Sequence, residues 1–230
     1  MDDARGPKIE IDLMDDARGP KIDPSERTQQ PIVKAGIGGG ASLSMQRRTL
    51  DSRFARRYFV GYGIDVGGGD DSLHQFVELF PLIENVFVYD KAQGDAQKLD
   101  NVGDAAFDFL FSSHCLEHVY DPVEAMSNWI RVVRSGGHLV ICVPDEDLYE
   151  QGVWPSTFNA DHKTSFTLCK ATSWSPVSVN VFDLVAKFCH LARPLSVATI
   201  DHAYRYNLPR FDQTSTPLCE SAIEIILKKL

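Results

Sequence analysis

A glycine-rich turn after a short apolar segment constrains the fold of this chain more than any other feature. Residues 63–66 read Gly-Ile-Asp-Val, and Gly67, Gly68 and Gly69 follow at once. Residues without a Cβ atom let the backbone turn sharply and approach a ligand closely, at the point where a helix begins. Three glycines are equally typical of an ordinary loop between a strand and a helix. The neighbouring segments must therefore show whether this turn binds a ligand.

Strand-like and helix-like segments alternate after this turn. Apolar runs typical of strands cover residues 63–66, 86–89, 107–111, 138–143, 196–201 and 222–227. Helices are expected over residues 43–59, 72–80, 122–133 and 179–189. The alternation predicts an α/β fold, a Rossmann-like, doubly wound, mostly parallel sheet of seven strands. The last two strands lack an amphipathic helix between them, so we expect an antiparallel strand at the sheet edge.

The N-terminal segment is expected to lie outside this fold. Residues 1–9 and 14–22 both read MDDARGPKI, and a glycine-rich run follows at residues 36–40. Such charged and glycine-rich sequence buries little surface. We predict a disordered or tag-like segment over residues 1–43 and one folded domain over residues 44–230.

Composition excludes several classes of function. The net charge of -9 gives a field that repels phosphates, so no nucleic-acid partner is expected. No apolar stretch approaches the ~20 residues of a membrane span. The five cysteines are scattered without a CxxC pair, which indicates neither a disulfide framework nor a thiolate zinc site. We expect a cytoplasmic protein, and the sequence leaves a homodimer open.

Asp90 indicates that the glycine-rich turn belongs to a nucleoside-binding site. It ends the second strand about 25 residues after Asp65, close to the offset at which an acidic side chain accepts hydrogen bonds from ribose hydroxyls. A dinucleotide site would need a GxGxxG turn, whereas Asp70 and Asp71 follow Gly69 here. These carboxylates would repel pyrophosphate and suit the cationic S-adenosyl-L-methionine.

Four blocks in order resemble the class I S-adenosylmethionine-dependent methyltransferases, particularly small enzymes associated with polysaccharide and O-antigen biosynthesis. The blocks are GIDVGGGDDSL at residues 63–73, VFVYD at 86–90, GDAQKL at 94–99 and FDFLFSSHCLEHVYDP at 107–122. The resemblance implies a cofactor loop formed by Asp65, Gly67, Gly68, Gly69 and Asp71, with the ribose on Asp90. It further implies that Asp95 and the Ala96 backbone read the adenine, and that Ser112, Ser113 and His114 lie near the methionine end. Asp71 departs from the family, in which many relatives carry Gly.

The fourth block also contains His114, Glu117 and His118, whose helical spacing would bring them onto one face. Three interpretations stay open. Glu117 and His118 could be structural, a histidine could be the general base that deprotonates a hydroxyl, or the three side chains could hold a divalent metal.

The long polar and aromatic segment after the strand at residues 138–143, residues 143–167, is expected to bind the acceptor, because ligands bind beyond the carboxyl ends of strands in such sheets. His162 is a second candidate base, with Asp161 orienting it, and Tyr149, Trp154 and Phe158 could stack on a sugar. The predicted catalytic residues are thus Glu117, His118 and His162.

The leading hypothesis is methyl transfer from S-adenosylmethionine to a hydroxyl of a small molecule or of a sugar in a surface polysaccharide. The first alternative is an inactive nucleoside-binding partner subunit, favoured only by Asp71. The second is a nicotinamide-dependent oxidoreductase, which the missing GxGxxG turn disfavours.

Overall fold

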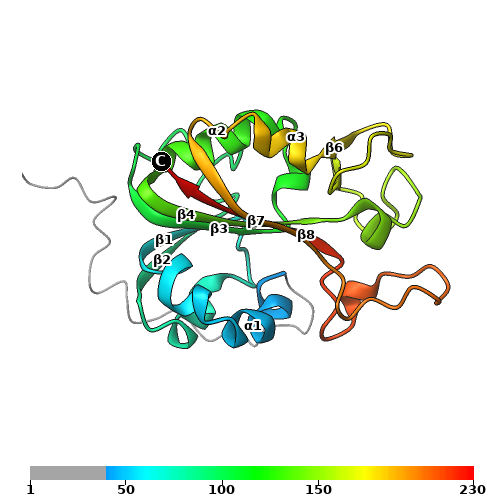
Figure 1. Cartoon of the computed structure of the whole chain (residues 1–230), viewed down its shortest axis with the longest axis horizontal. Coiled ribbons are helices and arrows are strands. Elements are labelled where there is room, and N and C mark those ends of the chain that lie inside the picture. The colour runs from blue at the N-terminus through cyan, green and yellow to red at the C-terminus, as the bar shows by residue number, and fades with distance from the viewer. Residues whose placement is uncertain (1–39) are drawn as a thin grey trace, which may run out of the picture.

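The computed structural model describes residues 40–230 and contains a mixed six-stranded sheet with helices on both faces (Figure 1). The strand order is β2-β1-β3-β4-β8-β7. The strands are β1 (Gly61–Val66), β2 (Ile83–Tyr89), β3 (Phe107–Ser113), β4 (Val133–Pro144), β7 (Ala192–Ile200) and β8 (Ala222–Lys229). The α/β class and the mostly parallel, Rossmann-like sheet are therefore confirmed.

Parallel pairing brings four strand ends to one edge of the sheet. β1 pairs in parallel with both β2 and β3, and β3 pairs in parallel with β4. The carboxyl ends of these strands therefore lie next to one another, where open α/β sheets bind ligands. The predicted site residues that follow β1, β2, β3 and β4 therefore lie at this edge.

The antiparallel element is β8, the second strand from the edge. β8 pairs antiparallel with β4, and β7 pairs antiparallel with β8. β7 therefore closes the edge while running in the same direction as β1 to β4. The two C-terminal strands form the expected antiparallel pair.

Within residues 40–230 the main sheet has six strands, whereas seven were predicted. The six strands lie at the six strand-like runs found in the sequence, and no seventh run was assigned to a strand. Residues 90–106, between β2 and β3, form turns.

Two layers of helix cover the sheet, and strand alternation divides the core between them. α2 (Pro122–Val132) and α3 (Val181–Ala186) lie on one side, and α1 (Gly40–Leu50) lies on the other (Figure 1). Leu110 packs with Trp129 of α2, whereas Phe109 and Phe111 pack on the α1 side. A strand buried on both faces is rich in apolar residues, and residues 107–111 are apolar except for Asp108.

Two predicted helices differ from the structure in type or length. The helix expected over residues 43–59 is divided into α1 and a short π-helix, η2 (Phe54–Tyr58), and the segment at 72–80 is a 3₁₀ helix, η3 (Leu73–Leu79). The helix at 179–189 shortens to α3 because residues 178–180 form β6 (Ser178–Asn180), which pairs with β5 (Ser165–Thr167). Helix α2 begins at Pro122 as expected, with Asp121 accepting hydrogen bonds from two backbone amides of its first turn.

The remaining short helices are η4 (Leu116–His118), η5 (Glu146–Glu150) and η6 (Gln213–Ser215). The helix α1 begins at Gly40, inside the segment predicted to lie outside the fold. The rest of that segment, residues 1–39 with the MDDARGPKI duplication, lies outside the described residues. Among residues 40–230, no helix combines the length and the apolar character that crossing a membrane requires.

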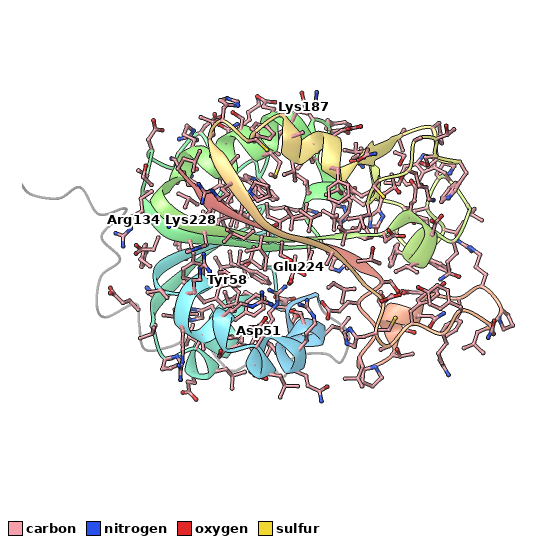
Figure 2. The ribbon with its side chains drawn as sticks, viewed as in Figure 1. Asp51, Tyr58, Arg134, Lys187, Glu224 and Lys228 are labelled. Atoms are coloured by element: carbon pink, nitrogen blue, oxygen red, sulfur yellow. The ribbon has the colours of Figure 1, made fainter. Side chains whose placement is uncertain are left out.

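Buried charges fasten α1 to the sheet. Arg48 is fully buried and its guanidinium lies 3.0 Å from the carboxylate of Glu224 on β8. Arg47 contacts both Glu220 and Glu224 at 2.8 and 3.0 Å. Figure 2 shows Glu224 on the face of the sheet that α1 covers. Arg47 and Arg48 are therefore both committed to internal ion pairs.

Candidate active site

A cavity of about 610 Å³ opens at the carboxyl ends of β1, β2 and β3. Five residues predicted to bind the cofactor line it, namely Gly67, Asp90, Asp95, Ala96 and His114. The cavity volume lies within the range of small-molecule sites. The strand ends thus gather the predicted nucleoside-binding residues around one space.

The glycine turn is shaped by close packing. Gly67 has a φ of +80°, and its amide donates a hydrogen bond of 2.7 Å to the carbonyl oxygen of Tyr89. A Cβ atom on Gly67 would lie 2.5 Å from Cβ of Cys115, and one on Gly68 would lie 2.6 Å from the Asp65 carboxylate. Gly69 also has a positive φ, of +49°. A larger side chain at Gly67 or Gly68 would force the loop open.

Asp65 and Asp71 support the loop and do not line the cavity. The buried Asp65 carboxylate accepts a hydrogen bond of 2.7 Å from the amide of Leu73. Burial raises the pKa of Asp65 to about 7. The Asp71 carboxylate accepts hydrogen bonds from the amide and the hydroxyl of Ser42, at 2.9 and 3.2 Å. Asp71 therefore connects the loop to α1, and it faces away from the space where its charge was expected to act.

Ser112 and Ser113 likewise do not line the cavity. The Ser112 hydroxyl is buried and donates a hydrogen bond of 2.8 Å to the carbonyl oxygen of Val66, which joins β3 to β1. The Ser113 hydroxyl lies near Gly40, where a Cβ atom would approach it to 2.7 Å. The chain then turns at His114, whose φ of +56° directs it into the cavity wall.

The opposite wall is formed by the segment after β2. Asp90 is partly exposed in the cavity, so its carboxylate can accept hydrogen bonds from two adjacent hydroxyls. Asp95 accepts a hydrogen bond of 2.8 Å from the amide of Gln97, and the Ala96 carbonyl accepts one of 2.8 Å from the indole of Trp129. These contacts hold a short turn beside Asp90. The two residues predicted to read the adenine, Asp95 and Ala96, therefore lie on the same wall as the residue predicted to bind the ribose.

A second, smaller cavity of about 170 Å³ adjoins the first. His114 and His118 line both cavities. The other residues of the smaller cavity are Gly40, Leu43, Glu117, Tyr149, Asn159, His162 and Thr214. The two histidines therefore stand between the nucleoside side and a polar compartment sized for part of a small acceptor.

Three histidines surround one buried carboxylate at this boundary. Oε1 of Glu117 lies 3.5 Å from Nδ1 of His114, and 3.9 Å from Nε2 of both His118 and His162. Glu117 is fully buried, and neither of its oxygens has a hydrogen-bond partner among the described residues. The three predicted catalytic residues thus form one cluster with His114.

Carboxylates on the far side orient two of these imidazoles. Nδ1 of His162 lies 2.7 Å from Oε1 of Glu150, which is almost fully buried, and Nδ1 of His118 lies 3.1 Å from Oδ2 of Asp161. Asp161 was expected to orient His162, and this assignment is wrong, because the loop directs its carboxylate at His118 and leaves His162 to Glu150. Both rings therefore present Nε2 to Glu117.

The cluster shifts the pKa of its members. Burial alone would raise the pKa of Glu117, but its contact with His114 and the charges of His118 and His162 lower it below the ordinary value. Burial alone would lower the pKa of His114, but its contact with Glu117 raises it overall. The carboxylate is thereby kept ionised in a buried place, which requires positive charge nearby.

The aromatic segment contributes one wall of the smaller cavity. Tyr149 lines it and packs against the ring of His162, with 5.3 Å between ring centroids. Phe158 lies behind Tyr149, at 5.9 Å, and beneath the guanidinium of Arg210. Trp154 lines neither cavity. Sequence reasoning missed Glu150, Asn159 and Thr214, since no local pattern separates them from other polar loop residues.

Residues 63–141 match the family model of a methyltransferase domain. The chain is similar to a structure of the Trm112 methyltransferase activator with a methyltransferase from Haloferax volcanii, with 14% identity, a TM-score of 0.53, and coverage of 82% of this chain and 89% of that one. It is similar to an S-adenosylmethionine-dependent methyltransferase from Listeria monocytogenes, with 13% identity, a TM-score of 0.52, and coverage of 83% and 97%. At these identities the structures show the fold alone. No curated protein matches the chain.

The match over residues 63–141 supports a methyltransferase domain, and the similar structures show the same type of fold. The match supports S-adenosyl-L-methionine as the cofactor, as the sequence predicts. Gly67 and Asp90, two of the residues predicted to bind it, line the larger cavity.

Proposed function

We propose that this methyltransferase transfers the methyl group to a hydroxyl oxygen of a small polyhydroxylated acceptor, such as a sugar. The observation that carries the proposal is the smaller cavity, which adjoins the nucleoside cavity and is lined by His118, His162 and Glu117. In this arrangement an acceptor in the smaller cavity meets the cofactor across His114 and His118.

S-adenosylmethionine supplies an activated methyl group: the acceptor oxygen bonds to the methyl carbon, the carbon–sulfur bond breaks with its electron pair on sulfur, and S-adenosylhomocysteine leaves. The hydroxyl proton must then be taken up by the protein. The chain's own task is to align the acceptor, exclude water and accept this proton.

An imidazole of the cluster supplies the proton acceptor in this proposal. His118 and His162 each have Nδ1 beside a carboxylate, which leaves Nε2 on the side of the cavity. The carboxylates stabilise the imidazolium that forms, as an orienting acid does in other histidine bases. An amine acceptor would lose its proton more readily, so the histidine–carboxylate pairs favour an oxygen acceptor.

The lining of the smaller cavity supports a polyhydroxylated acceptor. Asn159, Thr214 and Tyr149 offer hydrogen-bond donors and acceptors beside the histidines. The association with surface polysaccharide rests on the resemblance of the four sequence blocks. A cytoplasmic location is part of this proposal, and the five cysteines, which are all unpaired, suit a reducing compartment.

The proposal of an inactive partner subunit loses its one support. Asp71 replaces a glycine common in relatives, but its carboxylate bonds to Ser42 outside the cavity. The residue therefore does not block the nucleoside space.

Formation of S-adenosylhomocysteine in the presence of candidate acceptors tests the proposal. We expect turnover with sugars or nucleotide sugars, and none with amines of similar size. Mass spectrometry of the product should locate the added methyl on oxygen. Turnover with an amine and not with any hydroxyl compound would contradict the proposal.

A further inference from the structure

We propose that Glu117, His118 and His162 form a binding site for one divalent first-row transition metal ion. One ligand atom from each of these side chains lies within 4.8 Å of the others. Oε1 of Glu117 is 3.9 Å from Nε2 of either histidine. Ligand atoms that are each about 2.1 Å from one tetrahedral ion lie about 3.4 Å apart. The three side chains would therefore have to move together by about half an ångström to close around an ion.

The orientation of the imidazoles brings ligand atoms together at one point. Nδ1 of His162 lies 2.7 Å from Glu150, and Nδ1 of His118 lies 3.1 Å from Asp161. Both rings therefore present Nε2, the other ring nitrogen, on the side of the Glu117 carboxylate. Two imidazole nitrogens and one carboxylate oxygen that converge in this way are a ligand set for a cation.

The buried carboxylate of Glu117 gives a second, independent argument for a metal ion at this place. Its side chain is fully buried and both of its oxygens lack a hydrogen-bond partner within residues 40–230. Buried carboxylates are ordinarily paired, hydrogen-bonded or bound to a metal. Nδ1 of His114 lies 3.5 Å from Glu117 and pairs with it on one side, whereas Nε2 of His118 and of His162, each at 3.9 Å, lie beyond hydrogen-bond distance.

The outer contacts resemble those of metal sites. Metal-binding histidines commonly donate their second ring N–H to a carboxylate, which fixes the ring and raises its basicity. Glu150 provides this contact for His162 at 2.7 Å, and Asp161 provides it for His118 at 3.1 Å. Two imidazoles with one carboxylate suit Zn²⁺, Co²⁺, Mn²⁺ or Fe²⁺, and they suit Ca²⁺ and Mg²⁺ poorly.

The location of the site indicates what the ion would do. Glu117, His118 and His162 all line the smaller cavity, so a bound ion keeps positions open toward the acceptor. This consequence rests on the proposed function: the acceptor would carry two adjacent oxygens, such as a vicinal diol, that approach the ion together. An ion bound through Nε2 of both histidines would occupy the lone pairs that the proposed base uses, so the ion would then activate the acceptor hydroxyl in place of an imidazole. The metal site itself does not depend on the proposed function.

Titration of the metal-free full chain with Co²⁺, followed by visible absorption and calorimetry, tests the proposal. We expect one equivalent to bind with the absorption bands of a protein-bound ion. His162→Asn and Glu117→Gln should weaken binding at least 100-fold, and the exposed controls His190→Asn and Glu78→Gln should bind as the unchanged chain does. Glu150→Gln should weaken binding about 10-fold to 100-fold through the orientation of His162.

S-adenosylhomocysteine binding, measured on the same samples, shows that each variant is folded and separates the two proposals. Failure to bind Co²⁺, Zn²⁺ or Mn²⁺ by a chain that binds S-adenosylhomocysteine would overturn the metal site and leave the methyltransferase untouched. Equal Co²⁺ binding by His162→Asn and the unchanged chain would overturn it as well.

Discussion

Nδ1 of His162 lies 2.7 Å from Oε1 of Glu150, and both side chains are buried. The contact fixes the orientation of the imidazole, so Nε2 points to Glu117 at the boundary of the two cavities. A residue of the loop after β4 thereby acts on the site only through another side chain.

Glu150→Ala should reduce turnover more than Glu150→Gln does. The glutamine keeps an oxygen that can accept the Nδ1 proton, whereas alanine releases the ring. We expect kcat to fall about 10-fold or more for alanine, by analogy with other residues that orient histidines. S-adenosylhomocysteine affinity should stay within twofold in both variants, because Glu150 does not line the nucleoside cavity. An equal loss of cofactor binding would indicate a general disturbance of the fold.

His118→Ala and His162→Ala should lower turnover while cofactor binding persists. Either imidazole is placed to accept the hydroxyl proton, and general-base catalysis contributes about 10²-fold to 10⁴-fold. Steady-state kinetics with the true acceptor would measure the effect. Full activity of both variants would rule out a base role for this cluster.

Asp90→Ala should weaken S-adenosylhomocysteine binding by about 1.5–3 kcal/mol, the usual worth of hydrogen bonds to a charged group. Asp90 is the carboxylate that ends β2 in the larger cavity. Asp70→Ala is the matched control, since Asp70 is exposed on the same glycine turn and lines neither cavity. Calorimetry should find the control unchanged, and a similar loss in both variants would show that Asp90 does not hold the ribose.

Glu224→Ala should destabilise the fold by about 3–5 kcal/mol, because it leaves the fully buried Arg48 without its carboxylate. Arg48→Met should cost less, since Glu224 keeps Arg47 at 3.0 Å. The exposed pair of Arg53 and Asp51 provides the control, and Arg53→Ala should cost at most about 1 kcal/mol. Urea unfolding measures all three, and a small effect of Glu224→Ala would refute the role of this network in holding α1.

Because of His138, the free energy of unfolding should be lower in mild acid than at neutral pH. Burial lowers the pKa of His138 to about 4, aided by the charges of Arg57 and Lys228. The unfolded chain, with an ordinary histidine pKa near 6.5, then binds more protons than the folded one between pH 4 and 6.5. The free energy of unfolding should therefore rise with pH in this window, by up to about 1.4 kcal/mol per unit from this residue. His138→Leu should show a shallower slope, and an unchanged slope would count against the shift.

The fold was predictable from sequence because its signals are local. Predominantly apolar runs mark β1, β3 and the second half of β4, and Pro122 marks the start of α2. The number of strands was not predicted correctly, because seven were expected although strand-like runs stand out in only six places, and the main sheet has six strands. The 3₁₀ form of η3 is likewise set by packing and not by propensity.

The candidate site was likewise predictable from the sequence only in part. Gly67, Asp90 and His114 follow strand ends, and strand ends of a parallel sheet meet at one edge, so their meeting could be foreseen. Asp71 and Glu150 could not be assigned, because their partners Ser42 and His162 belong to segments whose relative placement no local pattern records. Tertiary packing alone decides which loop carboxylate meets which partner.

Titration of the full chain with S-adenosylhomocysteine and, separately, with NAD tests the central claim most directly. The account predicts one site for S-adenosylhomocysteine with micromolar affinity and no binding of NAD. Binding of NAD without binding of S-adenosylhomocysteine would contradict it.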